Sequence, residues 1–187
     1  MSNFKAFLAT FVVATLLITS CKKDKDPVIP NEEEVITTLK YTLTPAGGGT
    51  PVVLSFQDLD GDGGNAPVIT GGTLEANQTY TGDMVLLNEQ ENPVDNITEE
   101  IHEENKDHQF FFQTTIPGIK VSYTDSDADG HPVGLQTTLK TGDAGSGMLK
   151  ITLRHQPDKS ATGVPQGEIT NAGGETDIEV EFDVTVQ

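Results

Sequence analysis

The sequence contains no tryptophan, one cysteine and few basic residues. Because Cys21 is the single thiol, no disulfide can form within the chain. Eleven Lys and Arg residues stand against 29 Asp and Glu residues, which gives a formal net charge of −18 at pH 7. Nucleic-acid affinity comes largely from Lys and Arg on phosphates, so we expect no nucleic-acid partner. Adsorption to bare anionic lipid is disfavoured for the same reason.

A long apolar run is also missing, and the one hydrophobic stretch lies at the N-terminus. Lys5 precedes residues 6–18, which are uncharged and mostly apolar. This length suits a signal peptide and is too short for a helix across a bilayer core of about 30 Å. Residues 18–20 (Ile, Thr, Ser) then precede Cys21 in the pattern of a bacterial lipobox. We predict a lipoprotein signal peptide over residues 1–20 and acylation of Cys21, which anchors the protein to a membrane. The alternative is an ordinary leader that happens to contain a cysteine.

Residues 21–34 have the composition of a spacer, with mixed charge, two prolines and an acidic run. The Lys/Asp cluster at residues 22–26 resembles the surface-export signal of Bacteroidetes-type lipoproteins. This resemblance implies an outer-membrane anchor with the protein facing the cell surface. The alternative is a flexible tether that faces the periplasm.

The remainder, residues 35–187, alternates between apolar and polar residues with a period of two, which is typical of half-buried strands. The pattern is clearest over residues 178–186, where Ile, Val and Phe alternate with acidic residues. Six such segments, 35–43, 52–56, 119–123, 135–139, 149–153 and 178–186, and two short apolar runs, 84–87 and 110–112, are separated by Gly- and Pro-rich turns. We predict a single all-β domain, an antiparallel β-sandwich of about eight to nine strands.

One short helix is predicted near residues 97–105. Asn96 followed by Glu99 resembles a capping box, and Ile97 and Ile101 form one apolar contact line.

Two stretches of the chain resemble each other at a constant offset, residues 53–63 and residues 120–130. The similarity predicts a duplicated unit whose copies pack about a pseudo-twofold axis. Chance similarity between two hairpins is the alternative.

Each of these stretches contains Asp-x-Asp-x-Asp-Gly. The six carboxylates are those of Asp58, Asp60, Asp62, Asp125, Asp127 and Asp129. Three acids at alternate positions before a glycine form the opening half of a calcium loop. The twelfth position holds Ile69 or Gln136 rather than Glu, so neither loop is an EF-hand. Calcium is thus the candidate cofactor, and acidic β-turns are the alternative.

Histidine supplies a second candidate metal site. Of the four histidines, His108 opens a run of three phenylalanines and His155 ends a predicted strand. Their spacing matches no known metal-binding motif, so the two could bind a transition metal only if the fold brings them together. The alternative is ordinary solvated or hydrogen-bonded histidines.

Catalytic motifs are absent from the sequence. Ser146 lies between two glycines, but the pattern departs from the nucleophile motif Gly-x-Ser-x-Gly. No phosphate-binding glycine loop with a lysine is present. Acidic pairs are so numerous that some arise by coincidence, and a hydrolase with a carboxylate pair stays an alternative.

Three stretches, residues 54–63, 108–112 and 170–177, resemble a group of small uncharacterised Bacteroidetes-type outer-membrane lipoproteins. The resemblance covers most of the chain after residue 20 and implies a lipoprotein. The group is sometimes labelled "type 1 periplasmic binding fold superfamily protein", which implies an α/β fold that the β pattern contradicts. The resemblance transfers no functional residues.

These observations predict a non-enzymatic, lipid-anchored binding or accessory module of the cell envelope. Its partner would be a cation, a glycan or a neighbouring outer-membrane receptor. One alternative is a metal- or haem-capturing lipoprotein that serves an uptake receptor, which requires His108 and His155 to converge. The other is a surface hydrolase, which requires a cleft with two acids, at least one of raised pKa.

Overall fold

Strands make up most of the regular structure. The computed structural model describes residues 34–61 and 63–187; the predicted signal peptide, Cys21, most of the spacer and Asp62 lie outside the described residues. The elements in chain order are β1 (Thr38–Pro45), β2 (Val52–Gln57), β3 (Val68–Thr70), β4 (Gly72–Leu74), β5 (Thr79–Leu87), α1 (Ile97–Glu103), β6 (His108–Thr114), β7 (Lys120–Tyr123), β8 (Gln136–Lys140), β9 (Gly145–His155), the 3₁₀ turns η1 (Val164–Gln166) and η2 (Ile169–Asn171), and β10 (Glu175–Val186).

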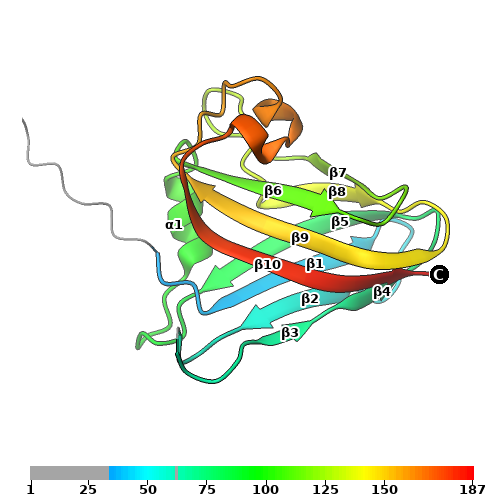
Figure 1. Cartoon of the computed structure of the whole chain (residues 1–187), viewed down its shortest axis with the longest axis horizontal. Helices are drawn as coiled ribbons and strands as arrows, with labels where there is room; N and C mark the ends of the chain where they lie inside the picture. The colour runs from blue at the N-terminus through cyan, green and yellow to red at the C-terminus, as the bar shows by residue number, and fades with distance from the viewer. Residues whose placement is uncertain (1–33, 62) are drawn as a thin grey trace, which may run out of the picture. The chain divides into compact units, whose positions relative to one another are not determined.

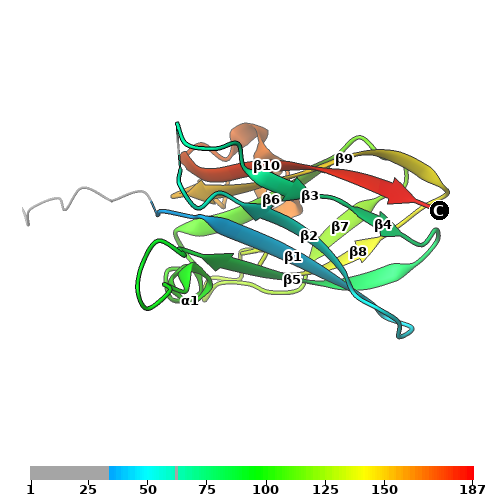
Figure 2. The same cartoon turned by 90° about the horizontal axis from the view of Figure 1, so that it is seen from below.

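These strands form two sheets that lie face to face (Figures 1 and 2). The larger sheet has the order β3-β2-β1-β5-β8-β7, and the smaller has the order β4-β10-β9-β6. Neighbouring strands are antiparallel except β4 and β10, which pair in parallel. The predicted all-β sandwich is confirmed, and the described residues do not form the α/β fold that the group label implies. The described strands number ten rather than eight or nine, because β3 and β4 have three residues each and give no periodic signal.

The core forms where the alternating faces of the two sheets meet. Leu39, Tyr41 and Leu43 of β1 are fully buried. On β10 the apolar residues at even positions from 178 to 186 are buried, and the acids between them are exposed, as predicted. Burial of each large apolar side chain contributes about 1.5–3 kcal/mol relative to exposure. The period of two therefore fixes which face of each strand points inward.

Helix α1 lies at one end of the sandwich (Figure 1) and ends two residues before the predicted boundary. Ile97 and Ile101 are buried, as their spacing predicted. The capping box does not form, because Asn96 makes no side-chain cap. The Thr98 hydroxyl instead bonds the backbone N–H and carbonyl of Leu86, which ties α1 to β5. Among the described residues, no helix is long and apolar enough to cross a membrane.

The predicted duplication is not found in the topology. Both Asp-rich stretches connect antiparallel pairs, β2 with β3 and β7 with β8. Their preceding strands differ, because β1 pairs with β2 in the larger sheet whereas β6 lies in the smaller sheet, away from β7. Similar turn residues thus produced two similar hairpins in unrelated surroundings.

A long excursion, residues 156–174, connects β9 to β10 and contains both 3₁₀ turns. It covers the outer face of β6, where Phe111 packs with Val164 and Ala172 in a small second core. The Cα partners at the base of the excursion are His155 and Glu175. Residues 156–174 therefore begin and end at the same point of the smaller sheet, next to His108, the first residue of β6.

Candidate functional site

Two histidines meet at the end of the smaller sheet that lies toward α1. His108 begins β6, His155 ends β9, and the antiparallel register places them directly opposite each other. Their ring centroids are 4.5 Å apart, with the rings nearly perpendicular. Both residues are buried. The metal-capture alternative required these two histidines to converge, and the structure brings them together.

A carboxylate reaches the histidines from β10. The register of β10 against β9 shifts between Thr176 and Ile178, which marks a β-bulge at Asp177. A bulge adds one residue to a strand and re-aims its side chain. The Asp177 side chain is only 1% exposed, and its oxygens lie 3.8 Å from His108 Nε2 and 3.8 Å from His155 Nδ1. Asp177 thus points into the cluster instead of outward like Glu179.

A second carboxylate comes from the chain just before β1. Glu34 Oε1 lies 3.7 Å from His108 Nε2, and the Glu34 side chain is 10% exposed. Burial, together with the negative charges of Glu100 and Asp177, raises the pKa of this carboxyl to about 7. From the sequence we predicted that Glu34 belongs to a solvated spacer. In the structure its side chain lies against His108, the first residue of β6.

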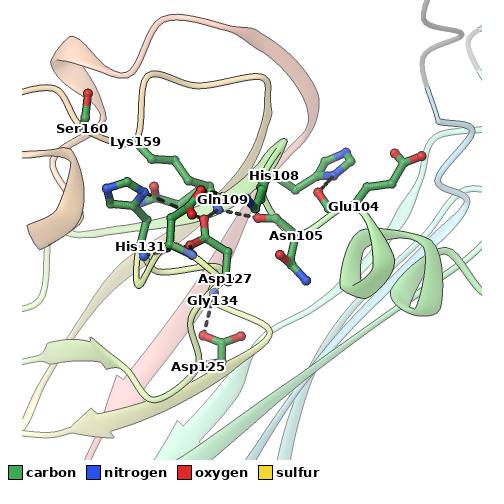
Figure 3. Close-up of polar contacts among 12 residues, drawn as sticks. Glu104, Asn105, His108, Gln109, Asp125, Asp127, His131, Gly134, Lys159 and Ser160 are labelled. Carbon is green, nitrogen blue, oxygen red and sulfur yellow. Dashed lines mark hydrogen bonds and ion pairs between the residues drawn. The ribbon is translucent and has the colours of Figure 1, made fainter.

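The hydrogen bonds of His108 fix which nitrogen faces the carboxylates. Nδ1 lies 3.1 Å from the backbone oxygen of Glu104, and a carbonyl only accepts, so Nδ1 carries the proton (Figure 3). In the neutral ring Nε2 then holds a lone pair. Among the described residues Nε2 has no hydrogen-bond partner. Burial lowers the pKa of His108, which favours this neutral form.

These groups form two overlapping triads that share His108. In the first, ligand atoms of His108, His155 and Asp177 lie within 4.8 Å of one another; in the second, those of Glu34, Glu104 and His108 do so. Ligand atoms around a tetrahedral zinc ion lie about 3.3 Å apart, given bonds of about 2.0–2.1 Å. Three of the spacings are 3.7–3.8 Å, and the other pairs within each triad are bounded only by 4.8 Å, so the side chains must draw together to hold an ion. Imidazole nitrogen and carboxylate oxygen are also the donors that zinc accepts.

The first Asp-rich loop uses its carboxylates within the loop. Asp58 accepts the backbone N–H of Gly61, and Asp60 accepts both the backbone and side-chain N–H groups of Asn65. These bonds are typical of Asp in tight turns. Asp62 lies outside the described residues.

The second loop is held by a buried ion pair. Asp127 accepts the backbone N–H groups of Asp129 and His131 and lies 3.0 Å from Lys159 Nζ (Figure 3). The ammonium therefore neutralises the carboxylate that a calcium ion would need. Asp125 accepts backbone N–H groups on the far side of the loop, and Asp129 pairs with Lys106 at the surface. Neither loop contributes to the converging groups found among the described residues.

Comparison of the chain with family models, with curated proteins and with solved structures finds no significant match. The class of the protein therefore rests on its own geometry. It is an all-β sandwich with a buried cluster of two histidines and two carboxylates at one end.

The sequence did not predict two members of the cluster, Asp177 and Glu34. Asp177 falls at an outward position if the alternation of residues 178–186 is extended backward, and only the bulge turns it inward. Glu34 ends an acidic run that resembles a solvated tether. Each residue has one local sequence feature that hinted at its position. Asp177 follows a Gly-Gly turn at the start of a strand, and Glu34 immediately precedes the first strand segment.

Proposed function

We propose that this protein is a lipid-anchored module of the cell envelope that holds a transition-metal ion of the zinc class at His108, His155 and Asp177. The observation that supports the metal most strongly is the buried convergence of two imidazoles and a carboxylate on three adjacent strands. The orientation of His108 adds to it, because metal-binding histidines commonly donate their other N–H to a carbonyl or carboxylate. The anchor at Cys21 rests on the lipobox pattern of the sequence.

The geometry favours a bare ion over haem. The two imidazole rings lie edge to face at 4.5 Å, in contact with each other. Two axial histidines would stand on opposite faces of the macrocycle with the whole plane between them. His108 and His155 leave no such space.

A surface hydrolase is less well supported. Glu34 and Asp177 both lie within 4 Å of His108 Nε2, and the Glu34 carboxyl has a raised pKa. A hydrolase needs such a pair to line a cleft that admits the scissile bond. Here the side chains are 10% and 1% exposed, so the pair is enclosed by protein. A buried donor set instead suits an ion that stays with the protein and stabilises its fold.

Thermal unfolding with and without metal tests this function. We expect Zn²⁺ to raise the Tm of the chelator-treated protein, because an ion that binds only the folded state stabilises it by about 2.7 kcal/mol at 100 times its Kd. At about 2–4 °C per kcal/mol for a chain of this size, the shift is roughly 5–11 °C. Ca²⁺ at the same concentration should leave the Tm unchanged, because the Asp loops are already hydrogen-bonded internally.

The variants H108Q and D177N should abolish the Zn²⁺-dependent shift. H102Q serves as the matched control, since His102 is exposed on α1 and should leave the shift intact. A wild-type Tm that does not respond to Zn²⁺, or a response that H108Q and D177N retain, would refute the proposed site.

A further inference from the structure

The proposed metal triad supplies three ligands, and a structural zinc site needs four. The strands of the smaller sheet provide His108, His155 and Asp177. The remaining donors near His108 are the carboxylates of Glu34 and Glu104, which form the second triad with it. A four-coordinate ion at this triad needs one of these two carboxylates as its last ligand.

Burial distinguishes the two carboxylates. Glu34 is enclosed by protein, with its Oε1 at 3.7 Å from His108 Nε2. Its other oxygen, Oε2, is buried and has no hydrogen-bond partner among the described residues. Burial of a carboxylate without a partner is costly, and a cation removes that cost. Glu104 is exposed, and its backbone carbonyl already accepts the proton of His108 Nδ1.

Charge balance limits the site to one of these two carboxylates. Two neutral imidazoles with the carboxylates of Asp177 and Glu34 carry a formal charge of −2, which a divalent ion neutralises. Addition of the Glu104 carboxylate would leave an excess negative charge in an already acidic region. A four-ligand set of two histidines and two acids is therefore the neutral one.

We propose, on the basis of the proposed metal site, that Glu34 is its fourth ligand and that the ion fastens the segment before β1 to the smaller sheet. Strand β1 belongs to the larger sheet, whereas His108, His155 and Asp177 lie on three strands of the smaller one. The bound ion therefore links the two sheets at the end where the chain arrives from the predicted anchor. Glu34 lies four residues before β1 begins, so its side chain can move toward the ion without disturbing a strand.

Metal titration of matched variants tests the fourth ligand. E34Q should weaken Zn²⁺ binding on the order of 10–100-fold in competition with a chromophoric chelator. With Co²⁺ as the probe, the strong visible bands of the four-coordinate ion should lose intensity in E34Q as water enters the coordination sphere. E104Q is the control; it keeps the backbone carbonyl and should leave both readouts unchanged. A melt in chelator shows that each variant is folded.

Hydrogen exchange provides a readout of the link itself. Zn²⁺ should slow exchange at the amides of Val35 and Ile36 in the wild type and leave it unchanged in E34Q. If the wild type binds no Zn²⁺, the proposed function fails and this inference fails with it. If the wild type binds Zn²⁺ through His108 and Asp177 while E34Q matches it in affinity and Co²⁺ spectrum, only the fourth-ligand assignment is overturned. An equal loss in E104Q also overturns it.

Discussion

Removal of the charge on Lys159 should cost far more stability than the same change at a surface lysine. Lys159 is 4% exposed, and its Nζ lies 3.0 Å from Asp127 Oδ2. The ammonium also donates to the backbone oxygen of Asn105. K159M keeps most of the aliphatic stem and removes the charge, which leaves the Asp127 carboxylate buried without its counter-ion.

The loss expected from K159M follows from that burial. Loss of one partner from a buried ion pair costs about 3–5 kcal/mol. Two backbone N–H groups still bond Asp127 in the variant, so we expect the lower end, about 3 kcal/mol. At about 2–4 °C per kcal/mol, the Tm should fall by roughly 6–12 °C. The double variant K159M/D127N should recover part of this loss, because it removes the uncompensated carboxylate.

A second lysine–aspartate pair in the same protein is the control. Lys106 and Asp129 are 2.9 Å apart with side chains 55% and 60% exposed, and solvent screens such pairs. K106M should therefore unfold in urea at the wild-type midpoint. Equal losses in K159M and K106M, or a loss in K159M within the ~1 kcal/mol typical of surface pairs, would refute the assignment of this pair as a stabilising buried contact.

Two further predictions concern pH and backbone packing. Although burial opposes ionisation, the hydrogen bonds from Lys159 and from the His131 amide hold the pKa of Asp127 below its usual value. The pair therefore stabilises the fold above about pH 3.9, the unfolded value. This stability is lost as the pH falls through the lower folded pKa, so the difference in free energy of unfolding between wild type and D127N should shrink only under acid conditions. For the backbone, G71A should lower the Tm strongly, because a Cβ there would overlap the carbonyl oxygen of Asp183. G47A, where a Cβ meets nothing within 4 Å, should stay within about 0.5 kcal/mol of wild type; equal effects would contradict the packing between residue 71 and β10.

The alternation of side chains was enough to predict the sandwich. On β10 the burial of Ile178, Val180 and Phe182 follows directly from a period of two. The same rule failed where the backbone departs from that period, because the bulge at Asp177 reverses the direction of one side chain. The short strands β3 and β4 were missed because three residues cannot show a repeat.

The histidine pair shows a different limit. His108 and His155 are 47 positions apart and meet only through the register of β6 with β9. Strand pairing of this kind depends on the whole fold, so the local spacing of the histidines could not predict that they meet. The Asp loops had the stronger local signal, but Asp and Gly favour turns as readily as they favour calcium, and Asp58, Asp60 and Asp127 accept hydrogen bonds within their own loops or from Lys159.

The position of β10 has a consequence for the order of folding. This strand comes last in the chain and lies between β9 and β4 in the smaller sheet. Its register joins Val184 to Gly72, residues separated by more than a hundred positions. Contacts of such high contact order form slowly. Strand β4 therefore cannot complete its pairing until β10 has been synthesised, and the smaller sheet closes late in folding.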